Sequence, residues 1–382
     1  MKKNYIYIIL AFVFLFYSSF AVAAEKVIKI AYYGPMTGDY AVYGKDMTTG
    51  MEVAIKEIND AGGIKKGPLE GYKFKMVGYD DKADVRESVN IAQKLCAEEK
   101  DLLAVFNGGS SSSTLAVLPV YERCGMPVIV PYSTNRRITK SGYSNVVRVV
   151  QDDIGQGQDI AWVICEKLKK KERIAVFYEN SDYGVGLRDV FTPEVKKYGG
   201  NIVAVESYIS AQDKDFSVIL TKIKALNPDA LVLLSGYNEG GLITRQARAM
   251  GIQAPIVSTT SLNTPTFIEL AGQEAAEGVI LAIFFNPESK DPKVVKFNDA
   301  YRKMFNRGAG ESSGLAYDSV YLLKDAIERG GTTRETVMKY LRATKDFIGV
   351  TGKMNFDEGG QVVGKIPGLL VVKSGKFVPM EW

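Results

Sequence analysis

A run of glycine and hydroxyl residues, Gly108 to Thr114, is the part of this sequence best suited to hold an anion. It follows the apolar stretch Leu102 to Phe106, which predicts a strand, and it opens a predicted helix. Glycines allow a tight turn, and the free amides and dipole at the start of a helix favour a negative charge. A phosphate loop is excluded because no Gly-Lys-Ser/Thr ending closes the segment. One serine would suffice to cap a helix, so the succession around Ser111 and Ser112 favours binding of a carboxylate.

A second group of hydroxyls, Tyr132, Ser133 and Thr134, directly follows another short apolar run that predicts a strand. These side chains therefore also stand at the carboxyl end of a strand. Arg136 or Arg137, just beyond them, is suited to pair with a ligand carboxylate through two hydrogen bonds. The alternative, equally compatible with the sequence, is that both arginines are exposed on the surface beside the site and do not contact the ligand.

Three tyrosines, Tyr43, Tyr183 and Tyr237, are expected in glycine-flanked loops after strands. Tyrosine has a flat apolar face and a hydroxyl, which suits the wall of a pocket for a small solute. The chain has 21 tyrosines, so each of these residues alone is weak evidence and only the shared pattern carries weight.

Catalytic and metal-binding residues are missing from the pattern. The chain has no histidine, which excludes imidazole as a base or a metal ligand. Its three cysteines form no Cys-x-x-Cys pair. The paired acids Asp80-Asp81 and Asp152-Asp153 have no nucleophile beside them and are interpreted as loop or capping residues. We expect neither an enzyme nor a cofactor or metal site, and the formal charge of +4 gives no argument for nucleic acid.

The first 24 residues predict a secretory signal peptide. Lys2 and Lys3 form a basic start, an uncharged apolar run extends from Tyr5 to Phe20, and small residues follow. Cleavage after Ala23 or Ala24 fits equally well, and a retained membrane anchor is the alternative. We expect a soluble protein in the periplasm.

Export places the cysteines in an oxidising compartment. Cys96 lies late in one predicted helix and Cys124 ends the next, and these two helices can lie side by side on one sheet face. They are expected to be either a disulfide or two buried, inert thiols. Cys165 lies in an apolar stretch and is interpreted as core packing.

Strands and helices alternate along nearly the whole chain, which predicts an α/β fold of parallel sheets covered by helices. The pattern restarts near residues 150–153, so two similar lobes are expected. Open sheets of this kind bind ligands at the carboxyl ends of their strands. If the two lobes face each other, the site is the cleft between them, and hinge motion closes it.

Several segments in order along the chain resemble periplasmic branched-chain amino-acid-binding proteins, the leucine-binding type of solute-binding protein. They are Ile30–Gly38, Tyr43-Gly44, Ile58–Ile64, Tyr79–Asp81, Ser110–Thr114, Ser181–Leu187, Asp215-Phe216, Arg245–Arg248 and Phe356–Gly360. The resemblance implies two Rossmann-like lobes (type I), joined by three crossings, and delivery of the solute to the permease of an ABC transporter. It implies a monomer that meets the membrane only through that permease. The lobes would comprise residues 25–150 with about 282–366, and 151–281 with about 367–382.

Family roles carry over by position. Ser111 matches the residue that holds the ligand carboxylate, while Tyr132 and Thr134 match positions that offer a carbonyl and a hydroxyl to the polar end of the ligand. Tyr43, Tyr183 and Tyr237 match tyrosines of the cleft wall. Ser112 and Ser133 adjoin the matched residues and are added to the expected site.

One position departs from the family pattern. Relatives that bind amino acids have an acid in the loop after the strand predicted here at Ile256 to Ser258. This chain has Thr260 at that position. A buried ammonium needs an anionic or strongly accepting partner. Asp182, Glu179 or Glu239 would compensate, or the ligand lacks an amino group, as aromatic acids and amides do. The cysteine pair common near the serine loop is also missing, with Ala83 and Ser110 at those positions, and Cys96 and Cys124 would substitute for it.

We therefore expect a solute-binding protein of an ABC importer. A receptor of this fold normally has a membrane segment and a signalling domain after the lobes. Docking of a free binding protein on a separate receptor leaves a sensory role open. A transcription regulator of the same fold would need an N-terminal helix-turn-helix, where the signal segment stands.

Overall fold

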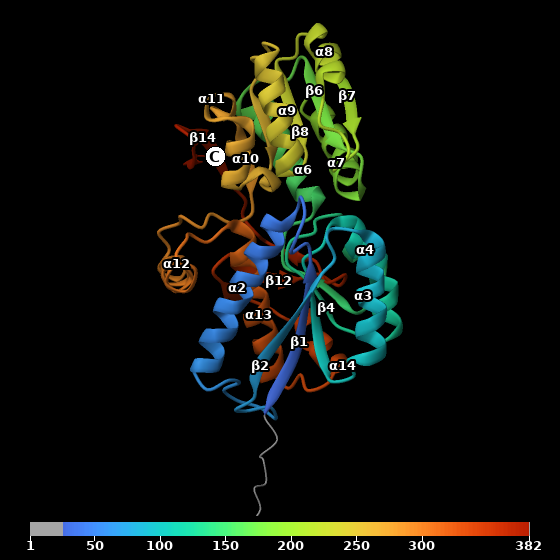
Figure 1. Cartoon of the computed structure of the whole chain (residues 1–382), viewed down its shortest axis with the longest axis vertical. Coiled ribbons are helices and arrows are strands. Elements are labelled where there is room, and N and C mark those ends of the chain that lie inside the picture. The colour runs from blue at the N-terminus through green and yellow to red at the C-terminus, as the bar shows by residue number, and fades with distance from the viewer. Residues whose placement is uncertain (1–25, 382) are drawn as a thin grey trace, which may run out of the picture.

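The computed structural model describes residues 26–381, so the predicted signal segment lies outside the described residues. Two sheets, each with helices on both faces, form two lobes arranged end to end (Figure 1). The chain passes between the lobes after β5, after β10 and between β13 and β14. The predicted α/β fold with two Rossmann-like lobes is confirmed, while the exact residue limits of the lobes stay a prediction.

The first lobe has a parallel sheet in the order β2-β1-β3-β4-β5. Its strands are β1 (Val27–Gly34), β2 (Lys73–Asp80), β3 (Leu102–Asn107), β4 (Val128–Val130) and β5 (Val146–Arg148). A small antiparallel sheet in this lobe consists of β11 (Phe347–Gly349), β12 (Gly352–Phe356) and β13 (Val362–Val363). Its helices are α2 (Ala41–Asp60), α3 (Val85–Glu98), α4 (Ser111–Arg123), α5 (Arg137–Lys140), α12 (Pro292–Phe305), α13 (Glu311–Glu328) and α14 (Arg334–Arg342).

The second lobe has a mixed sheet in the order β15-β14-β10-β9-β8-β6-β7. Its strands are β6 (Ile174–Glu179), β7 (Ile202–Tyr208), β8 (Ala230–Leu234), β9 (Ile256–Thr259), β10 (Ile280–Ile283), β14 (Gly368–Lys373) and β15 (Lys376–Met380), of which the last two are antiparallel additions. Its helices are α6 (Asp153–Trp162), which continues as a π-helix (Val163–Lys167), α7 (Asp182–Lys197), α8 (Ser217–Ala225), α9 (Tyr237–Ala249), a 3-10 turn (Thr260–Leu262), α10 (Pro265–Ala271) and α11 (Gln273–Ala276).

Strand β1 shows why its residues form a central strand. Ile28, Ile30 and Tyr32 pack into the core beneath α2 and α13, whereas Ala31 and Tyr33 pack beneath α3 and α4 on the other face. A strand buried on both faces is apolar at nearly every position, as the parallel arrangement requires. The core thus holds the carboxyl ends of β1, β3 and β4 at one edge, toward the second lobe (Figure 1).

The two cysteines that the sequence left open are joined. A Cys96–Cys124 disulfide links the end of α3 to the residue that follows α4, with the Cα atoms 5.8 Å apart. That separation lies within the normal range for a disulfide. Cys165 is free and buried in the second lobe, as the core-packing interpretation predicted.

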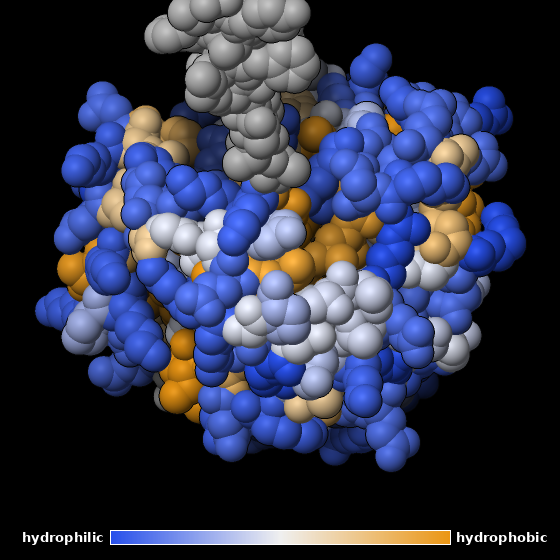
Figure 2. All heavy atoms as spheres, turned by 90° about the horizontal axis from the view of Figure 1, so that it is seen from below, coloured by the Kyte–Doolittle hydropathy of each residue, from blue (hydrophilic) through white to orange (hydrophobic). Residues whose placement is uncertain are grey.

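The outer surface of the first lobe is mainly hydrophilic, with separate hydrophobic areas between the charged side chains (Figure 2). Among residues 26–381, no helix combines the length and the apolar character needed to cross a membrane.

Candidate functional site

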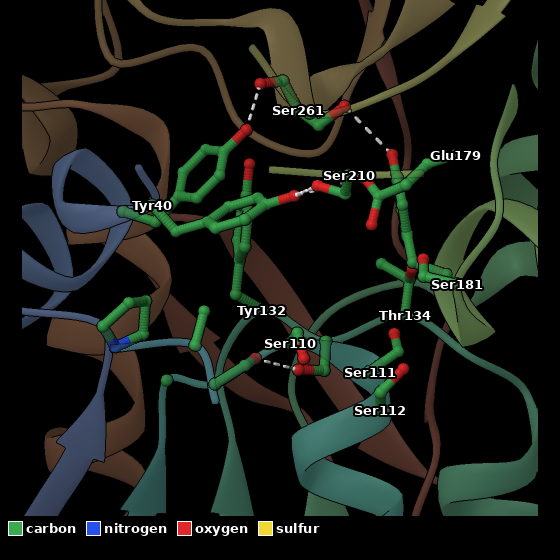
Figure 3. A pocket seen from close by; sticks show the side chains of 18 of the residues that line it. Tyr40, Ser110, Ser111, Ser112, Tyr132, Thr134, Glu179, Ser181, Ser210 and Ser261 are labelled. Carbon is green, nitrogen blue, oxygen red and sulfur yellow. Dashed lines mark hydrogen bonds between the residues drawn. The ribbon is translucent and has the colours of Figure 1, made fainter. Parts of the chain in front are cut away.

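A cavity of about 280 Å³ lies between the lobes, at the carboxyl ends of strands from both sheets. Nine of the residues that the sequence predicted for the site line it. They are Tyr43, Ser111, Ser112, Tyr132, Ser133, Thr134, Glu179, Tyr183 and Thr260. Figure 3 shows Ser110, Ser111 and Ser112 on the side of α4, opposite Glu179, Ser210 and Ser261 of the second lobe.

The amino-terminal turn of α4 forms one end of the cavity. Ser110 caps the helix by accepting a hydrogen bond from the Ser113 amide, so capping and binding are divided among the serines. The Ser111 Oγ accepts from the Asn135 amide at 3.3 Å, and the Ser112 Oγ accepts from the Asp182 amide at 3.3 Å. Each hydroxyl therefore keeps its own proton to donate to an anion at the positive end of the helix dipole.

The neighbouring loop, residues 132–135, is held from behind by a fully buried arginine. Arg148 donates to the Asn135 carbonyl at 2.6 Å and to the Gln361 Oε1 at 2.6 Å, and it lies 3.7 Å from Asp152. Burial lowers the pKa of Arg148 to about 10, which leaves it charged at neutral pH. Because Gln361 in turn donates to the Val150 carbonyl, the loop is tied to a crossing between the lobes.

Asp153, the first residue of α6, lies directly behind Thr134 and is more than the loop or capping residue that its sequence suggested. Its neighbour Asp152 does cap α6, but Asp153 is fully buried and neither carboxylate oxygen makes a hydrogen bond of good geometry. The Thr134 hydroxyl and the Arg136 amide lie against it. Burial raises the pKa of Asp153 to about 7, while the Thr134 hydroxyl and the charge of Arg148 oppose the rise.

Tyrosines form the wall of the cavity. The Tyr43 and Tyr132 rings lie 5.4 Å apart, and the Tyr43 hydroxyl donates to the Ser261 carbonyl across the cleft. The Tyr183 hydroxyl lies 2.6 Å from the Thr259 Oγ1. The expectation that these tyrosines stand in loops was wrong, because Tyr43, Tyr183 and Tyr237 lie in the first turns of α2, α7 and α9. Helix starts place them at the cleft edge with a fixed backbone.

Glu179, at the end of β6, is the acid that lines the cavity directly. Its Oε2 lies 3.4 Å from the Tyr40 hydroxyl of the first lobe, and that hydroxyl also contacts the Ser210 Oγ (Figure 3). Burial raises the pKa of Glu179 to about 7, although the Ser181 hydroxyl and the Gly236 amide favour its ionised form.

Five of the predicted site residues, among them both arginines, do not line the cavity. Tyr237 packs behind Tyr43, with ring centroids 5.0 Å apart. Asp182 pairs with Arg137 at 3.2 Å outside the cavity, and Arg136 is exposed. Glu239 is buried and accepts from the Ala211 amide at 3.0 Å, so it supports the wall from behind.

Thr260 lines the cavity at the position where the family pattern has an acid, and its hydroxyl is buried without a hydrogen bond of good geometry. A second acid lies behind it. Glu311, at the start of α13, accepts from the Phe284 amide at 2.7 Å and from Asn263 of the second lobe at 2.7 Å. These bonds hold Glu311 at the crossing after β10. Burial raises the pKa of Glu311 to about 7.

Sequence reasoning missed Tyr40, Ser181, Ser210 and the role of Asp153. Ser210 was missed because the clearly apolar run Ile202 to Val205 indicates only the first part of β7, which extends to Tyr208 and places Ser210 just beyond the strand end. Because such sheets bind ligands at the carboxyl ends of their strands, the correct end of β7 would have indicated Ser210. Asp153 has no such signal, since its burial depends on packing against Gly186 of α7, where a Cβ atom would lie 2.4 Å from the carboxylate.

A family model of periplasmic binding proteins matches residues 27–376. The chain belongs to this family. It is 33% identical over 371 residues, 96% of this chain and 92% of the relative, to the leucine-, isoleucine-, valine-, threonine- and alanine-binding protein of Pseudomonas aeruginosa. It is 32% identical over 353 residues, 92% of this chain and 91% of the relative, to the Leu/Ile/Val-binding protein of Escherichia coli K12.

A solved structure of a substrate-binding protein is also similar to this chain. The branched-chain amino acid transporter substrate-binding protein LivJ of Streptococcus pneumoniae, in complex with isoleucine, has a TM-score of 0.84 and 33% identity. The match covers 92% of this chain and 97% of that chain. The protein is accordingly a solute-binding protein of the ABC-transporter type and not an enzyme.

Proposed function

We propose that this periplasmic binding protein captures an α-amino acid with an aliphatic, branched side chain and delivers it to the permease of an ABC importer. The names of its relatives support this ligand class. The cavity supports it independently, because one face offers separate partners for a carboxylate and for an ammonium within the same short stretch of structure. Export by a cleaved signal peptide, a periplasmic location and a monomeric state belong to the same proposal.

The carboxylate of the ligand is placed at the start of α4. Ser111 and Ser112 have protons to donate, and the helix dipole adds a favourable field. None of the residues that line the cavity in the described chain is basic, so this helix terminus is the strongest anion partner there.

The ammonium is placed at Thr134 and the Tyr132 carbonyl, with Asp153 as the charge behind them. A hydroxyl has one proton and two lone pairs. If the Thr134 hydroxyl donates its hydrogen bond to ionised Asp153, the lone pairs of the hydroxyl face the cavity and accept from the ammonium. The fully buried carboxyl group of Asp153, whose oxygens make no hydrogen bond of good geometry, is the observation that carries the proposal, because a cation nearby offsets the cost of ionising it.

Thr260 favours a second candidate, an acid without an amino group, because this position has no charge to offer an ammonium. Aromatic acids and the keto acids of the branched-chain series belong to this class. A role as the binding component of a sensory system is compatible with either ligand.

Calorimetry on the protein purified after export tests the proposal. The panel comprises leucine, isoleucine and valine, the keto acid 4-methyl-2-oxopentanoate, leucinamide and benzoate. The proposed function predicts tight binding of the three amino acids and weak binding of the keto acid and the amide, since each lacks one charged group. Binding of the keto acid or of benzoate in preference to leucine would contradict it and would establish the second candidate.

A further inference from the structure

The end of the cavity that Glu179 lines is polar, although the proposed ligands have apolar side chains. Figure 3 shows Glu179 and Ser210 on the second lobe, apart from Ser111 and Ser112 on α4. If the charged groups of the ligand lie at α4 and Thr134, its side chain points toward Glu179. The chemistry of this end then decides which side chains are accepted.

Three groups from different elements converge there. Glu179 ends β6, Ser210 follows β7, and Tyr40 reaches over from the first lobe just before α2. The Tyr40 hydroxyl contacts the Ser210 Oγ and lies 3.4 Å from the Glu179 Oε2. Gly236 keeps this corner open, because a Cβ atom would lie 3.2 Å from the Tyr40 ring and 3.8 Å from the Glu179 Oε2.

A carboxylate in this position is costly unless donors surround it. Glu179 is only 7% exposed, and burial outweighs the help of Ser181 and the Gly236 amide, so its pKa is raised to about 7. An aliphatic side chain in this corner would leave that cost in place. A side chain that donates a hydrogen bond would offset it, because a charged acceptor forms the stronger hydrogen bonds.

We infer that Glu179, with Tyr40 and Ser210, forms a second polar subsite that also admits α-amino acids whose side chain ends in a neutral hydrogen-bond donor, a hydroxyl or a primary amide. This inference rests on the proposed function, since it requires an α-amino acid with its charged groups at the other end. It extends the ligand range beyond aliphatic side chains, and it excludes aspartate and glutamate, whose carboxylates would face Glu179.

Two pairs of ligands of nearly equal shape provide the test. Threonine replaces a methyl group of valine by a hydroxyl, and asparagine replaces the two methyl groups of leucine by an amide. Dissociation constants for all four are measured by calorimetry with the exported protein and with the variants Glu179→Met and Tyr40→Phe. The control is Glu206→Met, which removes an acid of the adjacent strand β7 that does not line the cavity.

The polar member of each pair is expected to lose about tenfold in affinity relative to the apolar member in Glu179→Met, and less in Tyr40→Phe. The control should leave both ratios unchanged. Equal weakening of both members in Glu179→Met would overturn the inference, because Glu179 would then act in lobe closure alone. If Glu179→Met fails to fold, an unchanged ratio in Tyr40→Phe overturns it equally. Failure of all α-amino acids to bind the parent protein would instead refute the proposed function.

Discussion

The two faces of the cleft present different chemistry. On the first lobe, the start of α4 offers donors for a carboxylate and the loop at residues 132–135 offers acceptors for an ammonium, with Arg148 buried behind them. On the second lobe, Glu179 and Ser210 offer acceptors, and Thr260 replaces the acid of the family pattern. The first face suits the groups that every α-amino acid shares, and the second suits the part in which amino acids differ.

The difference follows from how each face is supported. The first is held by the buried Arg148–Gln361 pair and by a disulfide between α3 and the end of α4, so its donors are fixed before a ligand arrives. The second includes a contact that exists only across the cleft, between Tyr40 and Ser210. The binding loop of the first lobe is therefore held mainly from within that lobe, although Asp182 and Asp153 of the second lobe contact Ser112 and Thr134. The Tyr40–Ser210 contact forms only when the lobes close.

The largest expected effect tests the assignment of the ammonium to the first face. Asp153→Asn is expected to weaken leucine binding by about 3–5 kcal/mol, the usual cost of removing one partner of a buried charge pair. Calorimetry measures it, and Asp159→Asn is the control, because Asp159 lies in the same helix and its burial likewise raises its pKa to about 7.

The stability of the same variant should move in the opposite direction. Burial raises the pKa of Asp153 in the folded protein to about 7 from an ordinary 3.8, so ionisation costs the ligand-free protein stability as the pH rises through that window. Asp153→Asn should therefore not lower the melting temperature at pH 8. A lower melting temperature together with unchanged binding would show a structural role only.

The disulfide tests whether the first face is preorganised. Replacing Cys96 and Cys124 together by alanine opens a link with a sequence separation of 28 residues. A loop of this length predicts a loss of about 2–4 kcal/mol in the free energy of unfolding, measured by denaturant titration. Leucine affinity at 25 °C should remain nearly constant, since Arg148 still holds the binding loop. A large loss of affinity would mean that the disulfide, and not Arg148, positions the serines of the site.

Ser111→Ala tests the carboxylate assignment. The lost hydroxyl is expected to weaken leucine binding by about 1–3 kcal/mol. Leucinamide, which has no carboxylate, should lose much less. The matched control is Ser319→Ala, a buried serine of α13 whose hydroxyl donates to the Leu315 carbonyl far from the cavity. Unchanged affinity for leucine in Ser111→Ala would remove this residue from the site.

The smallest expected effect is a pH dependence that both faces share. Binding of an ammonium requires ionised Asp153, and a hydrogen-bond donor beside Glu179 likewise favours its ionised form. Burial raises the pKa of both groups to about 7. Leucine affinity should fall about tenfold between pH 8 and pH 6, because only about a tenth of a group with that pKa is ionised at pH 6. In Asp153→Asn, leucine affinity should depend less steeply on pH. An identical pH dependence in the parent protein and in Asp153→Asn would show that protonation of Glu179, and not of Asp153, weakens binding.

Much of the molecule was predictable from local pattern. Met47, Met51, Ala54 and Ile58 recur at helical spacing, which predicts α2, and all four are buried in the core of the first lobe. The short apolar run before Tyr132 predicted the strand observed as β4, and the serine loop at the start of α4 was expected at the cleft. Such features depend on periodicity and on glycine and serine chemistry, which a short stretch of sequence contains in full.

Features that depend on distant segments were not predictable in the same way. The sequence allowed Asp182, Glu239 and Glu179 equally as acids of the site, and only packing separated them: Asp182 faces Arg137, Glu239 supports the Ala211 amide, and Glu179 alone of the three lines the cavity. Tertiary structure also decided that Asp153 is buried against α7 and that Cys96 reaches Cys124.

By itself, the order of apolar runs, glycines and hydroxyls determined the α/β fold, the two lobes and the anion-binding helix start, because each arises from neighbours in the chain. Only the tertiary structure decided which acids face the cavity and how strongly their charge is held. Burial, hydrogen-bond partners and pKa depend on atoms from helices and strands that are far apart in sequence, as the approach of Tyr40 to Glu179 across 139 residues shows.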